Sequence, residues 1–327
     1  MKLHAIGIAA CLSLAACGSS DESSPNKDGK QGVDEDAPID PSKAAALTVR
    51  VETHPIMVEP GADSMTCEFM EPLDRDLVVS GFGARQARGG HHMVLFRSIT
   101  PVEPGTIADC TSADSMANMM PALINMVTPE PGNISMEFPE GMAVVIPKGT
   151  QLVTQSHYIN TTEDPLAIHD RMDIWLSERD ISELTQLHLF IVSASDINIP
   201  PATKSHTVKA GCTLERDAQV LSLGAHMHEW GREIALDIGP AGSLRRIVET
   251  KDWKAEMRDI APIISFVEND QPMAAGFFAK GDDAQITCTY TNDDTYPVAF
   301  PNEMCAYSGY YVGSDEAASD IYCIEPR

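Results

Sequence analysis

Apolar residues recur in short alternating or β-branched segments from residue 47 onward, between clusters of Gly, Pro, Asn and Asp. Segments of this length, each bounded by turn residues, are typical of the strands of antiparallel β-sandwiches. The pattern therefore predicts an all-β protein. The ten expected strands cover residues 46–52, 76–82, 91–96, 142–147, 150–158, 187–194, 219–228, 233–238, 284–291 and 307–312.

One segment departs from this pattern and is predicted to be helical. In residues 111–127 four methionines, Met116, Met119, Met120 and Met126, recur mostly at the spacing of one helix face. Such a stripe can hold copper(I), or it can pack against the sheet as flexible apolar side chains do. The packing interpretation is favoured because most methionines are core residues.

The expected strand 219–228 contains the motif His-Met-His. Alternate strand residues share a face, so His226 and His228 lie opposite the apolar Leu223, Ala225 and Met227. Their backbones are expected to be about 7 Å apart, close enough for both imidazoles to reach one metal ion. Surface histidines also occur at this spacing, so the motif alone leaves both interpretations open.

Three further histidines stand in two other expected strands. His91 and His92 are adjacent, so they can share one metal ion only if the backbone bends or if they use different ring nitrogens. The preceding Gly89 and Gly90 permit such a bend. His157 is polar within a strand-like run, where a solvent-facing histidine is the simpler explanation.

These histidines belong to a series of short motifs that follow one another along the chain. "GGHHMVLF", "QSHY", "SASDINIPP", "HMH" and "NEMC" resemble the copper type II ascorbate-dependent monooxygenases, the family of peptidylglycine alpha-hydroxylating monooxygenase and dopamine beta-hydroxylase. Gly281-Asp282 leading to Cys288 adds to the match, which spans roughly residues 47–327. Separated motifs in the right order are far more specific than any one of them.

The resemblance implies a fold and two metal sites. The fold would be two tandem antiparallel jelly-roll sandwiches, residues 47–180 and 181–327, with one copper ion each, facing one another across an open cleft. The first copper would transfer electrons, and the second would be the catalytic one, where dioxygen reacts. The implied ligands are His91, His92 and His157 for the first copper, and His226, His228 and Met304 for the second.

Six cysteines follow residue 46, and none forms a CxxC motif, which argues against a structural zinc site. Three disulfides are the expectation for an exported chain, but the sequence alone does not choose among the possible pairings. The long gap between the second and third cysteines suggests two units that meet near residues 176–186. The resemblance implies the pairs Cys67 with Cys110, Cys212 with Cys323, and Cys288 with Cys305.

At least two of the three substrate-binding residues of the peptide-amidating family members are absent. Their arginine two residues before the His-x-His motif corresponds to Gly224, and their asparagine after Met-Cys corresponds to Ala306. Their tyrosine corresponds to Tyr307 or Ser308, depending on a one-residue gap. A peptide carboxylate clamp is therefore missing. Residues 253–278 are expected to contribute to the pocket, with Phe266, Phe277 and Phe278 either lining an apolar wall or filling the core.

The N-terminus predicts export. Residues 1–17 read as a signal peptide that ends in Leu-Ala-Ala-Cys, which resembles a lipobox with Cys17 as the lipidated residue. The alternative is a plain signal peptide with a chance cysteine. Gly18 after the cysteine favours the outer membrane of a two-membrane bacterium, so we expect a cell-envelope lipoprotein. Residues 18–46 are acidic and poor in large apolar side chains, which predicts a disordered tether.

The net charge of the protein limits the kinds of partner that it can bind. The formal net charge of −25 argues against nucleic-acid binding, and membrane contact is expected only through the lipid anchor. The expected function is a copper monooxygenase that hydroxylates a C–H bond of a small substrate with O2 and a one-electron donor such as ascorbate. The alternatives are a copper-buffering envelope lipoprotein without catalysis and a non-catalytic sandwich with unrelated histidines. The sequence does not indicate the oligomeric state of the protein.

Overall fold

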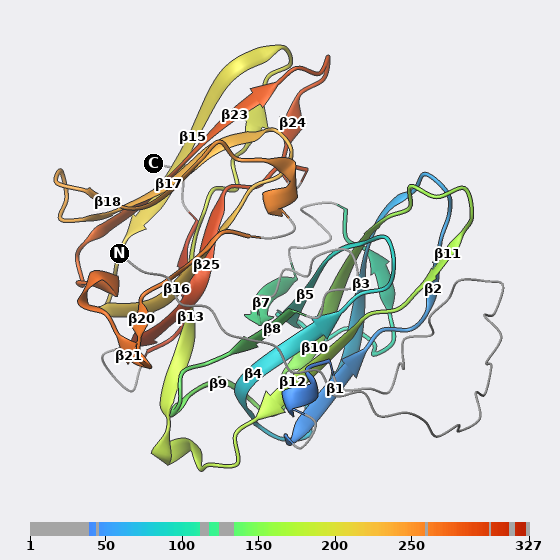
Figure 1. Ribbon diagram of the computed structural model, residues 1–327, viewed down its shortest axis with the longest axis horizontal. Coiled ribbons are helices and arrows are strands. Elements are labelled where there is room, and N and C mark those ends of the chain that lie inside the picture. The colour runs from blue at the N-terminus through green and yellow to red at the C-terminus, as the bar shows by residue number, and fades with distance from the viewer. Residues whose placement is uncertain are drawn as a thin grey trace, which may run out of the picture. The chain divides into compact units, whose positions relative to one another are not determined.

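The computed structural model describes residues 39–43, 46–111, 118–123, 134–258, 261–300, 302–313 and 318–324. In these ranges the regular structure is almost entirely β-strand, with four 3₁₀ turns and no α-helix (Figure 1). The predicted all-β sandwich fold is confirmed. The 3₁₀ turns are η1 (Pro41–Lys43), η2 (Ile181–Glu183), η3 (Ala255–Arg258) and η4 (Ala274–Gly276).

The N-terminal half forms one sandwich from two groups of strands. The first group is a five-stranded sheet in the order β6-β3-β10-β5-β7, and the second is β1-β12-β4-β9 with β8 paired to β4. A small separate sheet pairs β2 (Ile56–Val58) with β11 (Leu166–Ile168). The bounds of the two groups are β6 (Ile107–Asp109), β3 (Asp63–Pro72), β10 (Gln151–Ile159), β5 (Gly90–Ser98) and β7 (Met119–Leu123), then β1 (Thr48–Glu52), β12 (Arg171–Leu176), β4 (Leu77–Arg85), β9 (Met142–Ile146) and β8 (Ile134–Glu137).

The C-terminal half repeats this arrangement. A four-stranded sheet has the order β15-β23-β17-β18, and the opposing group is β13-β25-β16-β19, with β22 paired to β16 and β26 to β13. The bounds are β15 (Thr203–Thr213), β23 (Asp283–Asn292), β17 (Gly231–Gly239), β18 (Arg245–Lys251), β13 (Thr185–Ser193), β25 (Ala306–Gly313), β16 (Ala218–His226), β19 (Ile263–Ser265), β22 (Phe277–Phe278) and β26 (Ile321–Cys323), with the short pairs β14 (Asn198–Ile199) with β24 (Val298–Ala299) and β20 (Val267–Glu268) with β21 (Gln271–Pro272).

One sheet runs through both halves. Strands β9 and β13 pair in parallel, with Leu187 opposite Val144, so the opposing groups of the two sandwiches join into a single 11-stranded sheet. Leu187 and Tyr310 also pack in the N-terminal core. The expected junction between residues 180 and 181 falls at η2, just before β13.

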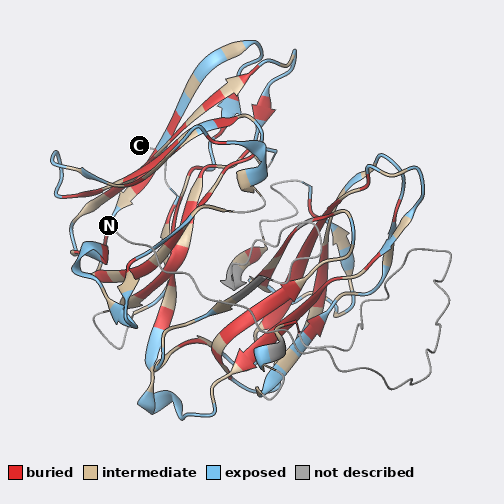
Figure 2. Ribbon diagram, viewed as in Figure 1, coloured by how far each residue is buried: buried red, intermediate tan, exposed pale blue. Residues whose placement is uncertain are grey.

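Each sandwich encloses an apolar core between its sheets (Figure 2). In the N-terminal sandwich, Val79 of β4 and Leu95 of β5 belong to one cluster. In the C-terminal sandwich, Leu223 of β16 packs with Leu236 of β17. Fully burying a side chain of this size stabilises the fold by about 1.5–3 kcal/mol, which explains why alternating apolar residues fix the strand faces.

All ten expected strands are present, but the structure also contains strands that the apolar pattern did not predict. Four of these, β3, β12, β15 and β18, interleave charged residues with apolar ones. In β12 the buried Arg171 and Asp173 form an ion pair, so their charges are compensated rather than exposed.

The helix predicted over residues 111–127 is wrong where the structure describes it. Residues Met119–Leu123 form strand β7, which pairs with β5. Met119 is buried in a small cluster with Cys67 and Phe96. Strand pairing and core packing therefore override the local helical spacing, and the packing interpretation of Met119 is confirmed. Met116 and Met126 lie outside the described residues.

The three disulfides implied by the resemblance are confirmed. Their Cα–Cα distances are 5.7 Å for Cys67–Cys110, 5.1 Å for Cys212–Cys323 and 5.9 Å for Cys288–Cys305. All three values lie within the usual range for a disulfide.

The signal peptide, Cys17 and most of the expected tether lie outside the described residues. The end of the tether segment is ordered, because Ile39 is only 1% exposed and its N–H donates to Asp173 at 3.4 Å. The described fold thus begins at Ile39 and not at residue 47. No helix in the described ranges has the length and apolarity to cross a membrane.

Candidate metal centres

Strand β16 ends at His226, the first residue of the His-Met-His motif, and its two faces have the predicted phase. Leu223, Ala225 and Met227 are fully buried, whereas Gly224 and His226 are partly exposed on the opposite face. The apolar face is anchored in the core, so the other face is free to present the histidines. The predicted assignment of Met227 to the core is confirmed.

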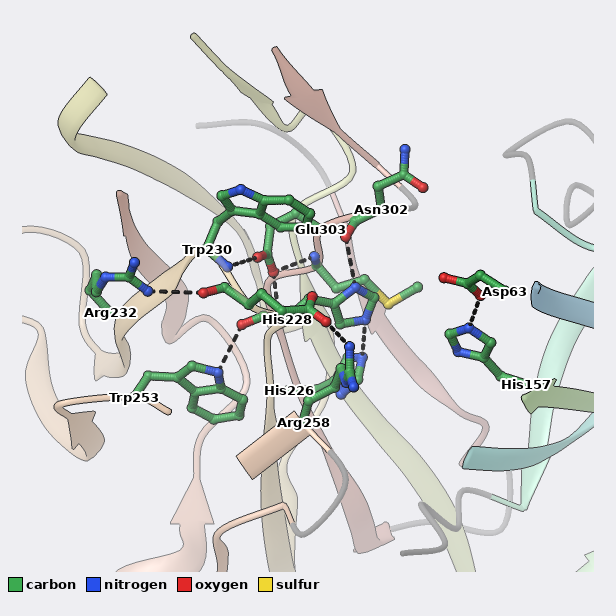
Figure 3. Close-up of polar contacts among 12 residues, drawn as sticks. Asp63, His157, His226, His228, Trp230, Arg232, Trp253, Arg258, Asn302 and Glu303 are labelled. Carbon is green, nitrogen blue, oxygen red and sulfur yellow. Dashed lines mark hydrogen bonds and ion pairs between the residues drawn. The ribbon is translucent and has the colours of Figure 1, made fainter. Parts of the chain in front are cut away.

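The two imidazoles of this motif converge. The Nε2 atoms of His226 and His228 lie 3.1 Å apart, and the ring planes meet at 84° (Figure 3). The Nδ1–H of His228 donates to the backbone oxygen of Asn302 at 2.8 Å, which turns its Nε2 toward His226. Two nitrogen ligands of one tetrahedral metal ion are separated by about 3.3 Å when each metal–nitrogen bond is about 2.0 Å. The pair forms an N–H···N hydrogen bond, and its spacing is also close to that of two ligands of one ion.

A buried carboxylate joins this motif to the segment that contains Met304. Glu303 is fully buried, and its Oε1 accepts the backbone N–H groups of His228 at 2.6 Å and Met304 at 2.8 Å (Figure 3). Its Oε2 accepts the N–H of Trp230 at 3.1 Å. Two N–H groups that share one oxygen atom are close neighbours, so Glu303 places the backbone of Met304 beside that of His228.

Burial controls the acidity of this carboxylate. Desolvation raises the pKa of Glu303 to about 7, although the N–H groups of His228, Met304 and Trp230 act in the opposite direction. Burial and the nearby Glu303 charge also raise the pKa of Tyr290. With this pKa the carboxyl group is about half ionised at neutral pH, and the three donors keep it from being more fully protonated.

Further contacts fix the backbone on either side of the motif. The hydroxyl of Tyr290 donates to the backbone oxygen of Met304 at 2.9 Å, and the disulfide from Cys305 to Cys288 follows directly. On the other side, Trp253 Nε1–H donates to the backbone oxygen of His228 at 3.0 Å. The backbones of both segments are thus held from several directions, which is how surrounding contacts fix the positions of metal ligands.

The N-terminal sandwich brings a second pair of histidines together. His157 of β10 lies directly opposite His92 of β5 in the strand register, and both side chains are buried. Their ring centroids are 4.9 Å apart with the planes at 72°. Pairing of these two strands therefore unites residues that are far apart in the sequence.

Both rings have hydrogen-bond partners at Nε2. His157 Nε2 faces Asp63 Oδ1 at 2.6 Å (Figure 3), and His92 Nε2 faces Gln155 Oε1 at 3.3 Å. A metal-binding histidine commonly donates its second ring N–H to an acceptor of this kind, which fixes the orientation of the ring. In this arrangement Nδ1 would be the coordinating atom of each ring.

The backbone irregularity expected at the adjacent histidines is present. His157 pairs with His92, but Tyr158 pairs with Gly90, so His91 is the extra residue of a β-bulge. Gly89 has φ +84°, and a Cβ added to Gly90 would lie 2.6 Å from the Cβ of Gln86. Both positions therefore require glycine. The side chain of His91 lies outside the described part of the structure.

Neither centre presents three acidic, cysteine or histidine ligands within the described side chains. Among these residues no group of three or more His, Cys, Asp or Glu is arranged to hold a metal ion. The predicted third ligands are the thioether of Met304 and the imidazole of His91. The structure thus brings together His226 with His228, and His92 with His157, and it places the backbones of Met304 and His91 beside them.

Sequence reasoning missed the residues that contact the predicted ligands. Gln155 stands two positions before His157, a strand spacing that could have identified it as a neighbour on the same face. Glu303 is adjacent to Met304 and could have been suspected as a buried acid beside a ligand. Asp63 gave no signal, because only the pairing of β3 with β10 brings it to His157.

None of the three atoms nearest to a Cβ built at Gly224, the position of the family's arginine, belongs to a charged side chain. A Cβ added to Gly224 would lie 3.7 Å from Ile263 Cγ1 and 4.0 Å from Ala261 Cβ, and Ile263 is 59% exposed. Arg258 of η3 is engaged in an ion pair with Glu229. The nearest neighbours of Gly224 are therefore two apolar side chains and the backbone oxygen of Ser308 at 3.7 Å.

The three phenylalanines of residues 253–278 divide between core and surface. Phe266 and Phe278 are buried in the C-terminal core, so the core interpretation is right for both. Phe277 is 47% exposed on β22.

No known family model matches the chain. Solved structures with partial likeness include the VP54 protein of PBCV-1, fitted into a reconstruction of the virophage Sputnik, at 10% identity and TM-score 0.29, covering 84% of this chain and 98% of that chain. PNGF-II matches at 10% identity and TM-score 0.31, covering 84% and 66%. A triple jelly-roll protein of an archaeal virus matches at 8% identity and TM-score 0.22, covering 86% and 62%. Likenesses with TM-scores this low carry no argument about function.

Proposed function

We propose that the protein is a copper-dependent monooxygenase that hydroxylates a C–H bond of a small substrate, using O2 and a one-electron donor such as ascorbate. The observation that carries the proposal is the convergence of His226 and His228, whose Nε2 atoms lie 3.1 Å apart beside the backbone of Met304. The ordered motifs shared with the copper monooxygenases support the same conclusion.

The chemistry of the donor set fits copper at both centres. Imidazoles bind both oxidation states of copper, whereas a thioether favours copper(I). His91, His92 and His157 would hold one ion, and His226, His228 and Met304 the other. Bound copper would supply one-electron redox chemistry and reactivity with dioxygen. Two chemically different centres suit an enzyme that must deliver electrons one at a time, and a copper store has no need of this difference.

The protein's own residues orient the ligands at each centre. Asn302 fixes the tautomer of His228 by accepting its Nδ1–H, and Asp63 does the same for the Nε2–H of His157. Substrate would lie on the exposed face of β16, beside His226. The missing side chain of Gly224 and the exposed Ile263 favour an uncharged substrate with an apolar group.

The protein would act in the cell envelope. Three disulfides are consistent with an oxidising compartment, and Cys17 would carry the lipid that anchors the chain to the outer membrane. Ascorbate or another small one-electron donor would then have to reach the centres from solution.

The test uses purified protein loaded with two copper equivalents and supplied with ascorbate. Oxygen uptake is followed with a library of neutral and anionic small molecules, and products are analysed after reaction in ¹⁸O2. We expect uptake coupled to a hydroxylated product that carries one labelled oxygen, with neutral compounds preferred. Tight copper binding without any coupled product would make copper buffering the better account.

A further inference from the structure

Glu303 is the buried carboxyl group that contacts both proposed ligand segments of the C-terminal centre. Its carboxylate is fully buried and accepts three backbone N–H groups, from His228, Met304 and Trp230. We propose that Glu303 is a positioning residue that holds His228 and Met304 in the register needed to bind one copper ion. The inference rests on the proposed function, because it takes both residues as ligands.

The connection spans segments that are distant in the chain. The bond from the His228 N–H to Glu303 joins residues 75 positions apart. The His-Met-His motif lies at the end of β16, and Met304 lies in the connection between β24 and β25. Asn302 and Glu303, which directly precede Met304, both bond to His228. These two contacts hold the segment that contains Met304 against the His-Met-His motif.

A carboxylate performs this task better than any neutral side chain. Its two oxygens accept all three N–H groups, whereas glutamine offers one oxygen and an NH2 group that would oppose an N–H donor. Burying a charge is costly unless hydrogen bonds compensate it, and here three do. The ligands of the proposed ion are neutral, so Glu303 also supplies a nearby negative charge for a bound cation.

Two consequences separate positioning from a merely structural role. Loss of the Glu303 charge should raise the one-electron reduction potential of the adjacent copper, because a nearby anion favours copper(II) over copper(I). Loss of the Oε1 contact should loosen the position of the Met304 thioether relative to the imidazoles. Supporting groups of metal ligands typically contribute about 10–100-fold to metal affinity.

The experiment compares the full chain with Glu303→Gln, Glu303→Asp and the control Glu229→Gln. Glu229 is the sequence neighbour of His228, but its carboxylate is 43% exposed and pairs with Arg258. Copper(I) affinity of the C-terminal centre is measured by competition with a chelator, sulfur coordination by X-ray absorption, and the reduction potential by redox titration. Amide hydrogen exchange at residues 228–230 and 304 is followed without metal.

We expect Glu303→Gln to bind copper(I) about 10–100-fold more weakly, to lose part of its sulfur scattering and to show a raised potential and faster exchange at these amides. Glu303→Asp keeps the charge with a shorter reach, so its potential should stay near that of the wild type while its affinity falls. If Glu303→Gln does not fold, Glu303→Asp is the variant that tests the proposal. Glu229→Gln should match the wild type in copper(I) affinity, sulfur scattering and amide exchange.

Two results would overturn the assignment in distinguishable ways. A wild-type protein that binds no copper at this centre would remove the proposed function and the positioning role with it. A wild type with normal copper and sulfur scattering, together with folded Glu303 variants of unchanged affinity, potential and exchange, would overturn the role of Glu303 alone.

Discussion

The Nε2 atoms of His226 and His228 face each other at 3.1 Å at the end of β16. This relationship depends on the strand phase, which buries Met227 between them, and on Asn302, which accepts the Nδ1–H of His228. Two imidazoles in this position can bind copper, but they do not by themselves favour copper(I). The difference between the two proposed centres therefore depends on Met304.

Met304→Ile removes the thioether and keeps an apolar side chain of similar volume. We expect hydroxylation to be abolished, while copper remains bound at the three-histidine centre. Copper content by metal analysis and product formation by mass spectrometry check this outcome. Turnover retained in the variant would remove Met304 from the mechanism.

Asp63→Asn tests the support of the three-histidine centre. Asp63 Oδ1 lies 2.6 Å from His157 Nε2 and would orient the ring. We expect copper binding at this centre to weaken by about 10–100-fold, with the C-terminal centre unchanged. Asp109→Asn is the control, because Asp109 lies on the neighbouring strand β6 and bonds to Thr111. Chelator competition that shows equal affinities in both variants would argue against the role of Asp63 in orienting His157.

The disulfide between Cys288 and Cys305 is predicted to support Met304. It closes a 17-residue separation, so replacing both cysteines by serine should lower the free energy of unfolding by about 3 kcal/mol. We also expect weaker copper binding at the C-terminal centre. Denaturant unfolding and copper titration measure the two effects.

The matched control replaces Cys67 and Cys110, which are linked in the N-terminal sandwich. This pair should also destabilise the protein, but it should leave copper at the C-terminal centre unaffected. Equal loss of that copper in both double variants would show that general destabilisation, and not the position of the Met304 backbone, is responsible.

Asp170 should make stability depend on pH. Burial raises its pKa from 3.8 to about 6, against hydrogen bonds from Ser156, Tyr158 and Gln86 that lower it. The folded state thus holds this proton more tightly than the unfolded chain, so the contribution of Asp170 to stability is greatest below about pH 4 and falls as the pH rises through about 6. The loss amounts to at most about 3 kcal/mol.

Asp170→Asn removes this titration. Relative to the wild type, the variant should gain up to about 3 kcal/mol in unfolding free energy between pH 4 and pH 7, measured by denaturant titration at each pH. The comparison cancels the effect of the other carboxylates, which titrate in both proteins. A constant difference between the two proteins would show that Asp170 does not change its pKa on folding.

The fold was predictable where one physical signal dominates. Alternation of apolar residues identifies β16 and β23, because each has one face in the core. Strand β12 escaped notice because a buried Arg171–Asp173 pair breaks its apolar pattern. The methionine-rich segment was misread as a helix because its local spacing carries no information about pairing with β5.

The candidate centres were likewise predictable from the sequence only in part. The phase of β16 predicted the common face of His226 and His228, and Gly89 and Gly90 predicted the irregular backbone at His91. Supporting contacts such as that of Asp63 with His157 arise only when distant strands pair, so local pattern cannot reveal them. The link from Met304 to the histidines came from ordered motifs and not from spacing.

X-ray absorption at the copper edge of the ascorbate-reduced protein tests the central claim most directly. We predict two bound copper ions per chain and a sulfur scatterer on one of them, which disappears in Met304→Ile while nitrogen scattering remains. A wild-type spectrum with only nitrogen and oxygen scatterers, or a sulfur contribution that persists in Met304→Ile, would contradict the assignment of His226, His228 and Met304 as one copper site.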